Sequence, residues 1–391
     1  MRANIPLSLY VHMPWCVSKC PYCDFNSHGL RGAEPDHAGY VDALVADLDG
    51  DLADFGEAVT GREIVSVFLG GGTPSLFPPA QIGRLLEAAR GRLRFAADVE
   101  VTMETNPGAV EHGRFEDYRD AGVNRLSFGV QSFDDAMLRR LGRIHGAAEA
   151  EHAFARARAA GFDNINLDLM YALPRQDMAG ALDDIQRALA LEPEHISHYQ
   201  LTLEPNTAFA ADPPPLPDED AAWDMQEACQ ARLAAAGYAQ YEVSAYARGG
   251  YRCAHNLNYW RFGDYLGIGA GAHGKISLER EIRRRWKLRH PRNYLEAGAR
   301  AARIGADHAV ARDELAFEYM LNALRLVDGT PIGELPARTG LPLADLAGPL
   351  REAVERGWLE PAGEHLRATP LGQRFLNDVI SLFMPPNRSP R

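Results

Sequence analysis

Three cysteines near the start of the chain are the residues best suited to chemistry. Cys16, Cys20 and Cys23 follow a C-x3-C-x2-C spacing. Three thiolates placed in this way can ligate one face of a cubane [4Fe–4S] cluster and leave its fourth iron without a protein ligand. Structural zinc favours four protein ligands, and no second C-x-x-C or H-x3-H lies nearby. We therefore predict a [4Fe–4S] cluster rather than zinc on these cysteines.

Other motifs with polar or small residues stand where expected strands end. The segments Gly70–Ser75 and Glu104–Pro107 each follow an apolar run, Gln131 follows another, and Asp168 lies at the end of a fourth. The cysteine loop also follows such a run. Because the carboxyl ends of parallel strands meet at one edge of a sheet or barrel, we expect these residues to share one pocket.

The first 210 residues alternate short β-branched or aromatic runs with Ala/Leu/Arg-rich amphipathic stretches, which indicates repeated βα units and an α/β fold with a parallel sheet. The expected strands are Leu7–His12, Ile64–Leu69, Val99–Glu104, Arg125–Gly129, Ile165–Leu169 and Ile196–Leu201. The expected helices between them include Tyr40–Leu52, Pro79–Arg90 and Ala147–Ala160.

A proline-rich segment, Ala210–Asp218, marks a predicted domain boundary. A helix is expected near Ala221–Ala235, followed by an aromatic-rich stretch to Trp260 and a glycine-rich run over Gly263–Gly274. From about residue 313 the pattern is helix, turn, short helix, helix and hairpin, which is typical of a winged-helix unit. We therefore predict domains at residues 1–210, 211–305 and 306–391.

Composition limits the classes of function. The chain of 391 residues carries a formal net charge of −12, which disfavours a general nucleic-acid-binding role. A locally basic stretch over Arg280–Arg292 is expected to be a solvated face, with contact to an anionic ligand or partner as the alternative. The sequence contains no long apolar run and no signal-peptide pattern, so we expect a cytoplasmic protein.

The motifs together resemble the radical SAM superfamily, whose three-cysteine loop binds a [4Fe–4S] cluster that chelates S-adenosylmethionine (SAM). The segment FLGGGTPS agrees with that superfamily. The resemblance narrows to the group of oxygen-independent coproporphyrinogen dehydrogenases through LYVHMPWC, METNP, RLSFGVQSF, LGRIH and DLMYALP. It implies a partial (β/α)6 radical SAM barrel with a C-terminal helical domain. By motif, the residues that would contact SAM are Tyr10, Tyr22, Gly71, Gly72, Thr73, Glu104, Gln131, Arg143 and Asp168.

Two features favour the haem-chaperone branch of this group, the HemW family. Phe25 stands where the dehydrogenases resemble C-x3-C-x2-C-x-C and would have a fourth cysteine. The segment His255–Trp260, HNLNYW, is similar to the HNxxYW motif of the chaperones. The resemblance implies that His255 offers a nitrogen to haem iron. Cys253 is an alternative iron ligand, and the sequence excludes neither His12 nor His273.

The resemblance implies a chaperone that binds haem, a [4Fe–4S] cluster and SAM, and passes haem to respiratory haem proteins. The resemblance also implies a haem or electron donor protein and a second copy of the chain as partners, with at most peripheral membrane contact. The main alternative is a radical SAM enzyme that acts on a porphyrinogen. A DNA-binding redox regulator is a third reading, which the acidic charge disfavours. In one loop, Ala172 and Arg175 stand where relatives often have glycine. This departure concerns only the backbone conformation of that loop.

Overall fold

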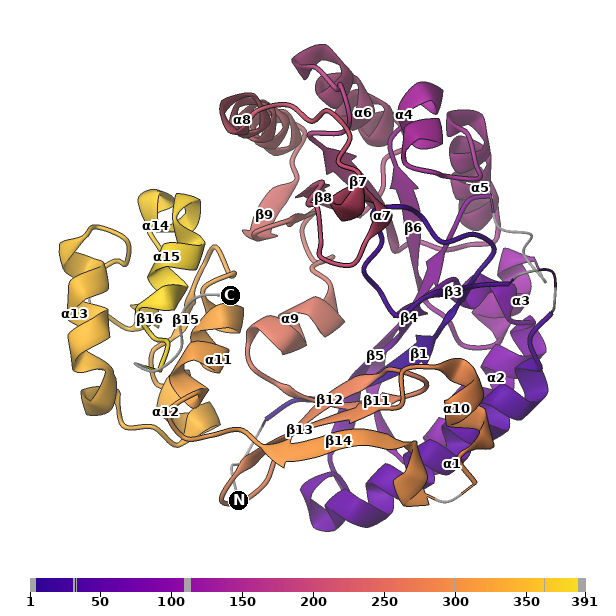
Figure 1. Cartoon of the computed structure of the whole chain (residues 1–391), viewed down its shortest axis with the longest axis horizontal. Helices are drawn as coiled ribbons and strands as arrows, with labels where there is room; N and C mark the ends of the chain where they lie inside the picture. Colours follow the sequence, from indigo (N-terminus) through magenta and orange to yellow (C-terminus); the bar gives the residue numbers. More distant parts are fainter. Residues whose placement is uncertain are drawn as a thin grey trace.

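A computed structural model describes residues 5–30, 32, 34–108, 114–298, 300–361 and 363–385. The outer ends of the predicted first and third domains therefore lie outside the described residues. A sheet of twelve strands runs through the molecule in the order β14-β13-β12-β11-β1-β4-β5-β6-β7-β8-β10-β9. Figure 1 shows that this sheet is strongly curved, with helices on its outer side and the C-terminal helices at one end.

The six strands expected from the sequence lie next to one another and are all parallel, which confirms the partial (β/α)6 barrel. Most of their residues are buried, because helices cover one face and the polar pocket closes the other. The strands are β1 (Leu7–Met13), β4 (Glu63–Gly71), β5 (Arg94–Thr105), β6 (Arg125–Gln131), β7 (Ile165–Tyr171) and β8 (His195–Gln200).

Helices cover the outside of the barrel, and several start at an aspartate. Asp36, Asp177 and Asp218 each accept a hydrogen bond from a backbone N–H in the first turn of the helix that follows. The first helix thus begins at His37 rather than at the expected Tyr40. The outer helices are α1 (His37–Phe55), α2 (Pro79–Arg90), α3 (Phe115–Asp120), α4 (Asp135–Arg140), α5 (Ala147–Ala159), α6 (Met178–Ala190) and α8 (Glu219–Ala235).

Both edges of the barrel are extended by strands that the sequence analysis did not identify. β11 (Asp264–Ile268) pairs in parallel with β1, and β12 (His273–Ser277), β13 (Ile282–Lys287) and β14 (Ile304–Ala309) continue the sheet in antiparallel order. At the other edge, β10 (Ala245–Ala247) and β9 (Ala239–Glu242) follow β8. The glycine-rich run is therefore a strand pair: a Cβ at Gly267 would lie only 1.9 Å from the carbonyl oxygen of His273.

The expectation that the basic stretch is a solvated face is wrong for two of its residues. Arg285 and Lys287 on β13 are buried. The Lys287 ammonium donates to Asp47 at 2.6 Å and to Asp51 at 2.7 Å, both on α1, and Arg285 donates to Asp51 at 2.8 Å. These ion pairs hold β13, and with it the strands paired to it, against α1. Alternation along a strand explains the error, because every second side chain of β13 turns inward.

The C-terminal residues form a separate hydrophobic core. Phe262, in the turn after α9, and Ile282 of β13 join this core next to Tyr319 and Met320. A bridge between Leu359 and Ala368 forms the expected hairpin, whose residue 362 is outside the described range. The elements are α11 (Leu315–Ala323), β15 (Thr330–Pro331), α12 (Glu334–Thr339), α13 (Ala347–Glu355), β16 (His365–Leu366), α14 (Pro370–Arg374) and α15 (Leu376–Ser381).

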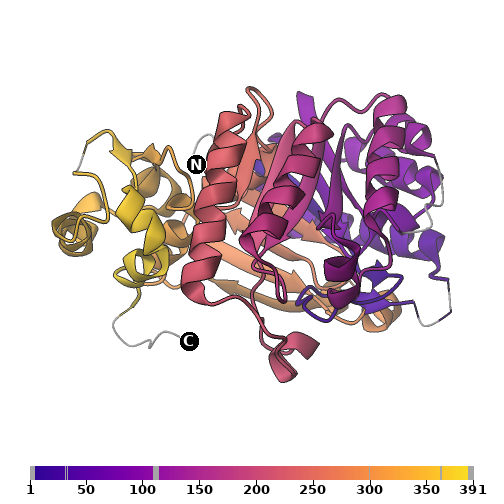
Figure 2. The same ribbon diagram turned by 90° about the horizontal axis from the view of Figure 1, so that it is seen from above.

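Figures 1 and 2 place this C-terminal unit at the end of the molecule opposite α2 to α5. Helix α9 (Ala254–Trp260) lies between it and the barrel, in contact with α11, β1 and β4. Among the helices of the described residues, none has the length and apolarity needed to cross a bilayer.

Candidate functional site

The cysteine loop is fixed at its two ends. Cys16 belongs to β2 (Trp15–Cys16), which pairs with β3 (His28–Gly29) and so closes the loop between them. Within the loop, the Cys23 N–H donates to the Cys20 carbonyl at 3.2 Å. All three cysteines are partly exposed and line one cavity of about 470 Å³ at the carboxyl edge of the parallel strands. The barrel thus presents three thiols to a single cavity, as the spacing predicts.

Each thiol has a polar neighbour from a different part of the chain. Thr73 Oγ1 donates to Cys16 Sγ at 3.5 Å, Arg143 Nη1 donates to Cys20 Sγ at 3.5 Å, and Cys23 Sγ lies 3.6 Å from Ser27 Oγ. Burial raises the pKa of the Cys16 and Cys23 thiols. Hydroxyl and guanidinium donors stabilise negative sulfur, as the sulfurs of iron–sulfur sites require. This donor set suits a cluster held by thiolates.

The glycine segment after β4 packs tightly against the cysteine loop. The Thr73 N–H donates to the Trp15 carbonyl at 2.8 Å. A Cβ at Gly72 would come within 2.5 Å of the Met13 carbonyl oxygen and 2.6 Å of that of Trp15. Gly71 has a φ of 98°, a conformation that glycine adopts at little cost. Gly71, Gly72 and Thr73 therefore line the cavity through a close approach of two backbones.

Replacing Gly72 by alanine is expected to destabilise the chain by about 1–3 kcal/mol, because its backbone neighbours must move to admit the methyl group. Gly91→Ala is the matched control, since there a Cβ would meet only ordinary contacts at 3.6 Å and φ is −69°. Denaturant unfolding of both variants measures the difference. Equal stabilities would show that the loop at Gly72 is not closely packed.

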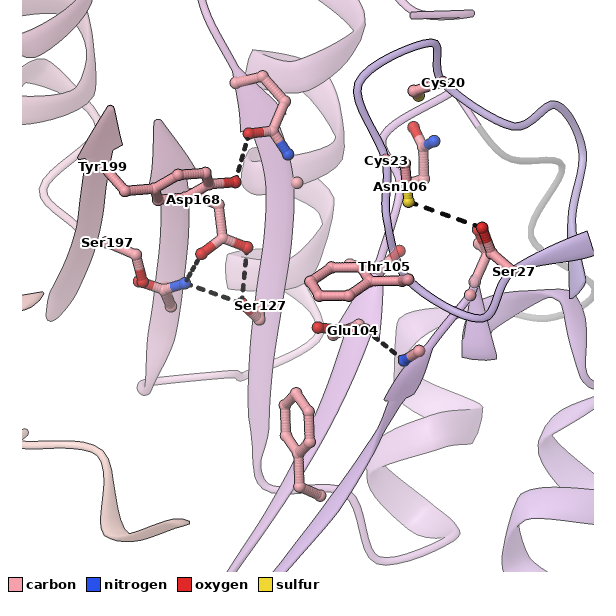
Figure 3. Close-up of a pocket in the computed structure, with 18 of the residues that line it drawn as sticks. Cys20, Cys23, Ser27, Glu104, Thr105, Asn106, Ser127, Asp168, Ser197 and Tyr199 are labelled. Atoms are coloured by element: carbon pink, nitrogen blue, oxygen red, sulfur yellow. Dashed lines mark hydrogen bonds between the residues drawn. The ribbon is translucent and has the colours of Figure 1, made fainter. Parts of the chain in front are cut away.

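Two half-buried carboxyl groups stand on the opposite side of the cavity. Burial, with a further contribution from the charge of Asp168, raises the pKa of Glu104 to about 8, although the Gly71 N–H donates to Glu104 Oε2 at 2.9 Å. Burial likewise raises the pKa of Asp168, which accepts hydrogen bonds from Ser127 Oγ at 3.1 Å and Asn166 Nδ2 at 2.8 Å. Figure 3 shows both carboxyl groups facing the cavity across from the cysteine loop. A cationic ligand would favour their ionised forms.

The other predicted residues complete this lining, with one exception. Gln131 Oε1 accepts a hydrogen bond from the Tyr199 hydroxyl at 2.8 Å, and Arg143 Nη2 donates to the Gly129 carbonyl at 2.6 Å. Tyr22 also lines the cavity. Tyr10 does not: its hydroxyl lies 2.7 Å from His12 Nδ1, and its ring lines the two adjoining clefts.

Sequence reasoning missed several polar residues at the ends of the strands. Ser127 and Tyr199 line the cavity together with Asn166 and Ser197, and Figure 3 shows the hydrogen bond between Ser127 and Asp168. Ser197 and Tyr199 stand two positions apart in the expected strand Ile196–Leu201 and so lie on one face of it, which was the available signal.

His255 lines the same cavity but is held from behind by Glu100 of β5. The Glu100 carboxylate accepts hydrogen bonds from the N–H of Ala254 at 2.8 Å, from the N–H of His255 at 3.2 Å and from His255 Nδ1 at 2.9 Å. Burial lowers the pKa of His255, so its neutral ring donates from Nδ1. Against the effect of burial, this hydrogen bond and the charge of Arg125 hold the pKa of Glu100 below its ordinary value.

Cys253 completes a small group of donor atoms. Its Sγ lies 3.0 Å from His255 Nδ1, and the Glu100, Cys253 and His255 donor atoms all lie within 4.8 Å of one another. Arg125 Nε is 4.0 Å from the same carboxylate, and this nearby positive charge disfavours a metal cation at the group. The role of His255 as a ligand of haem iron stays a prediction, because both of its nitrogens are engaged in this conformation.

Comparison with known proteins adds to this geometry. The family model of the Radical SAM superfamily matches residues 10–188, and that of the HemN C-terminal domain matches residues 310–375. The chain is 50% identical over 380 residues to "Heme chaperone HemW" of Escherichia coli (97% of this chain, 98% of the relative). It is 33% identical over 384 residues to the protein of the same name in Bacillus subtilis (96% and 99%). The solved structure of the coproporphyrinogen III oxidase HemN from Escherichia coli, described as a radical SAM enzyme, aligns with a TM-score of 0.81 at 25% identity and covers 97% of this chain and 90% of that chain.

Proposed function

The chain belongs to the family of the heme chaperone HemW within the radical SAM superfamily, and from this premise we propose that it binds haem and delivers it to respiratory haem proteins. The observation that carries the proposal is similarity over nearly the whole length to proteins of that name. As such a protein it would work in the cytoplasm, with at most peripheral membrane contact. Its partners would be a haem or electron donor protein and a second copy of the chain.

The resident cofactors of the proposal are a [4Fe–4S] cluster and SAM in the cavity described above. Cys16, Cys20 and Cys23 would hold the cluster, and Thr73 and Arg143 would stabilise its sulfur ligands. Such a cluster, when bound, supplies an open iron for SAM and a one-electron redox centre. The half-buried carboxyl groups on the opposite wall suit the positive charge of SAM.

SAM binding is expected to strengthen as the pH rises toward about 8. Burial and Asp168 raise the pKa of Glu104 to about 8, so at neutral pH its carboxyl group is largely protonated and attracts a cation weakly. At pH values between the ordinary pKa of a glutamate and about 8, binding of one cation releases one proton from Glu104. The affinity for the cation therefore rises by at most roughly tenfold per pH unit. Calorimetric titration with SAM at several pH values measures this dependence.

The matched variant for this test is Glu104→Gln. Ionisation of SAM itself is common to both proteins, so the difference between their pH profiles isolates the carboxyl group. A Glu104→Gln profile as steep as that of the wild type would contradict the proposed role of Glu104.

Haem delivery is tested by transfer. The chain is loaded with haemin and mixed with a respiratory cytochrome from which haem has been removed, and the spectrum of the cytochrome is followed. The proposal expects transfer from the loaded chain to be faster and more complete than from an equal amount of haemin bound to an unrelated protein. If the two sources deliver haem alike, the chain is not a chaperone for that acceptor.

A second candidate function is a radical SAM enzyme acting on a porphyrinogen. It is favoured by the close structural similarity to the coproporphyrinogen III oxidase HemN. Phe25 is 61% exposed at the position where that group is expected to have a further cysteine, which argues against it. Product analysis with coproporphyrinogen III, SAM and a reductant decides between them: protoporphyrinogen IX formed at an enzymatic rate would establish the second function.

A further inference from the structure

A second cleft, of about 310 Å³, opens between α9, the extended strands β11 to β13 and helix α11 of the C-terminal unit. Its walls are largely aromatic. The rings are those of Tyr10, Phe68, Tyr259, Trp260, Phe262 and Tyr265. Two of them, Tyr259 and Trp260, are the last residues of the HNLNYW segment. A flat aromatic molecule would find matching surface here.

The charged residues around this cleft are all cations. Lys275 and Arg284 line it, and none of its described lining residues is acidic, although the whole chain has a net charge of −12. Lys275 is paired with Asp264 and Arg284 with Glu318, so both charges are partly compensated. The cavity with the cysteines is lined by charges of both signs, namely Glu104, Asp168 and Glu242 with Arg125 and Arg143. The aromatic cleft differs from it in being lined by cations alone, which suits an anionic ligand.

Phe68 separates the two clefts, since its ring lines both. The ring is stacked on His255 at 4.1 Å on the side of the first cavity and on Tyr10 at 5.9 Å. A ligand in the aromatic cleft would therefore lie close to SAM without competing for its site. His255, stacked on Phe68 and tied to Glu100, is part of the wall between them.

His273 on β12 faces the aromatic cleft and is accessible. Its ring is stacked on Trp286 at 5.7 Å, and neither ring nitrogen has a hydrogen-bond partner in the described part of the chain. Partial burial, with the charges of Arg284 and Arg289, lowers its pKa, so the ring is neutral at physiological pH and keeps a free lone pair. Arg289 lines the adjoining cleft together with His273 and forms no salt bridge within the described ranges.

We propose that the aromatic cleft is the haem-binding site and that His273 supplies the nitrogen that ligates haem iron in this conformation. The proposal rests on the proposed haem-chaperone function and names its site. The porphyrin would lie against Tyr259 and Trp260, and its propionates would be attracted by Arg284 and Arg289. His255 then serves as a positioning residue, which holds α9 and Phe68 in place between haem and SAM.

The test is titration of the full-length, cluster-reconstituted chain with haemin, followed by absorption and by electron paramagnetic resonance of the ferric iron. His273→Ala is expected to weaken binding at least tenfold and to change the ligand-sensitive spectrum, and added imidazole should restore the original spectrum. His308→Ala is the matched control: His308 is also exposed and packs against Trp286 at 5.4 Å, but it lines neither cleft. It should bind haemin as the wild type does.

Other outcomes separate this assignment from the chaperone function itself. If His273→Ala binds haemin with unchanged affinity and spectrum, the assignment of His273 is overturned. If His255→Ala alone loses the spectrum while its fold and cluster content are preserved, the iron ligand is His255. If the wild type itself binds haemin no better than an unrelated protein does, the proposed function fails and the assignment fails with it.

Discussion

Replacing Cys16, Cys20 or Cys23 singly by alanine is expected to abolish the [4Fe–4S] cluster. Each of the three thiols lines the same cavity, and the two other cysteines of the chain, Cys229 and Cys253, are buried away from the loop. A cubane cluster with only two protein ligands would leave two irons open to solvent and would not survive purification. Iron and acid-labile sulfide measured after anaerobic reconstitution should fall to background in all three variants.

Cys229→Ala provides the matched control for these variants. Its thiol is buried beneath α8 and points at the Ala181 carbonyl, so the substitution removes a cysteine without touching the cavity. Cluster content should match that of the wild type. A full cluster in any variant of the loop, or its loss in Cys229→Ala, would show that the cluster is not ligated as proposed.

Glu100→Ala is expected to destabilise the fold by about 3–5 kcal/mol, because removing one partner of a buried ion pair leaves the other charge uncompensated. Arg125 would lose its carboxylate neighbour at 4.0 Å while fully buried. The N–H groups of Ala254 and His255 would lose their acceptor at the start of α9. Denaturant unfolding monitored by circular dichroism measures the loss.

Two further variants make this test specific. Glu151→Ala removes a carboxylate that pairs with Arg187 while 41% exposed, and such a surface pair contributes about 0–1 kcal/mol. Glu100→Gln keeps an acceptor for the backbone N–H groups but not the charge, and should lie between the two alanine variants. If Glu100→Ala unfolds no more easily than Glu151→Ala, the carboxylate does not hold α9 to the barrel.

The sequence was sufficient for the parts of the fold that depend on local pattern. The expected strand at Arg125–Gly129 corresponds to β6, and Pro79–Arg90 is a helix with the same bounds as expected. A buried parallel strand is a continuous run of apolar residues, and an amphipathic helix repeats its apolar residues every three or four positions. Both patterns can be recognised without knowing which distant residues they contact. The expectation that strand-end motifs meet in one pocket holds for the same reason: parallel topology alone brings Gly72 and Asp168 to one edge.

Other features depend on partners distant in sequence. Glu100 and His255 are 155 positions apart, and nothing around either residue indicates the pair. In the sequence, Lys287 is one of many cations in a basic stretch. Its burial depends on Asp47 and Asp51 of α1, with which it forms salt bridges. The strand at Asp264–Ile268 is short and lies within a glycine-rich run, so its pairing with β1, more than 250 positions away, is not evident from local pattern.

Anaerobic reconstitution with iron and sulfide, followed by titration with SAM and then with haemin, tests the central claim most directly. The account predicts one [4Fe–4S] cluster, one SAM and one haem per chain, with haem bound whether or not SAM is present, because Phe68 separates the two clefts. A chain that takes up cluster and SAM but binds haemin only weakly and without saturation would contradict the chaperone function. The radical enzyme would then be the better account of the same cavity.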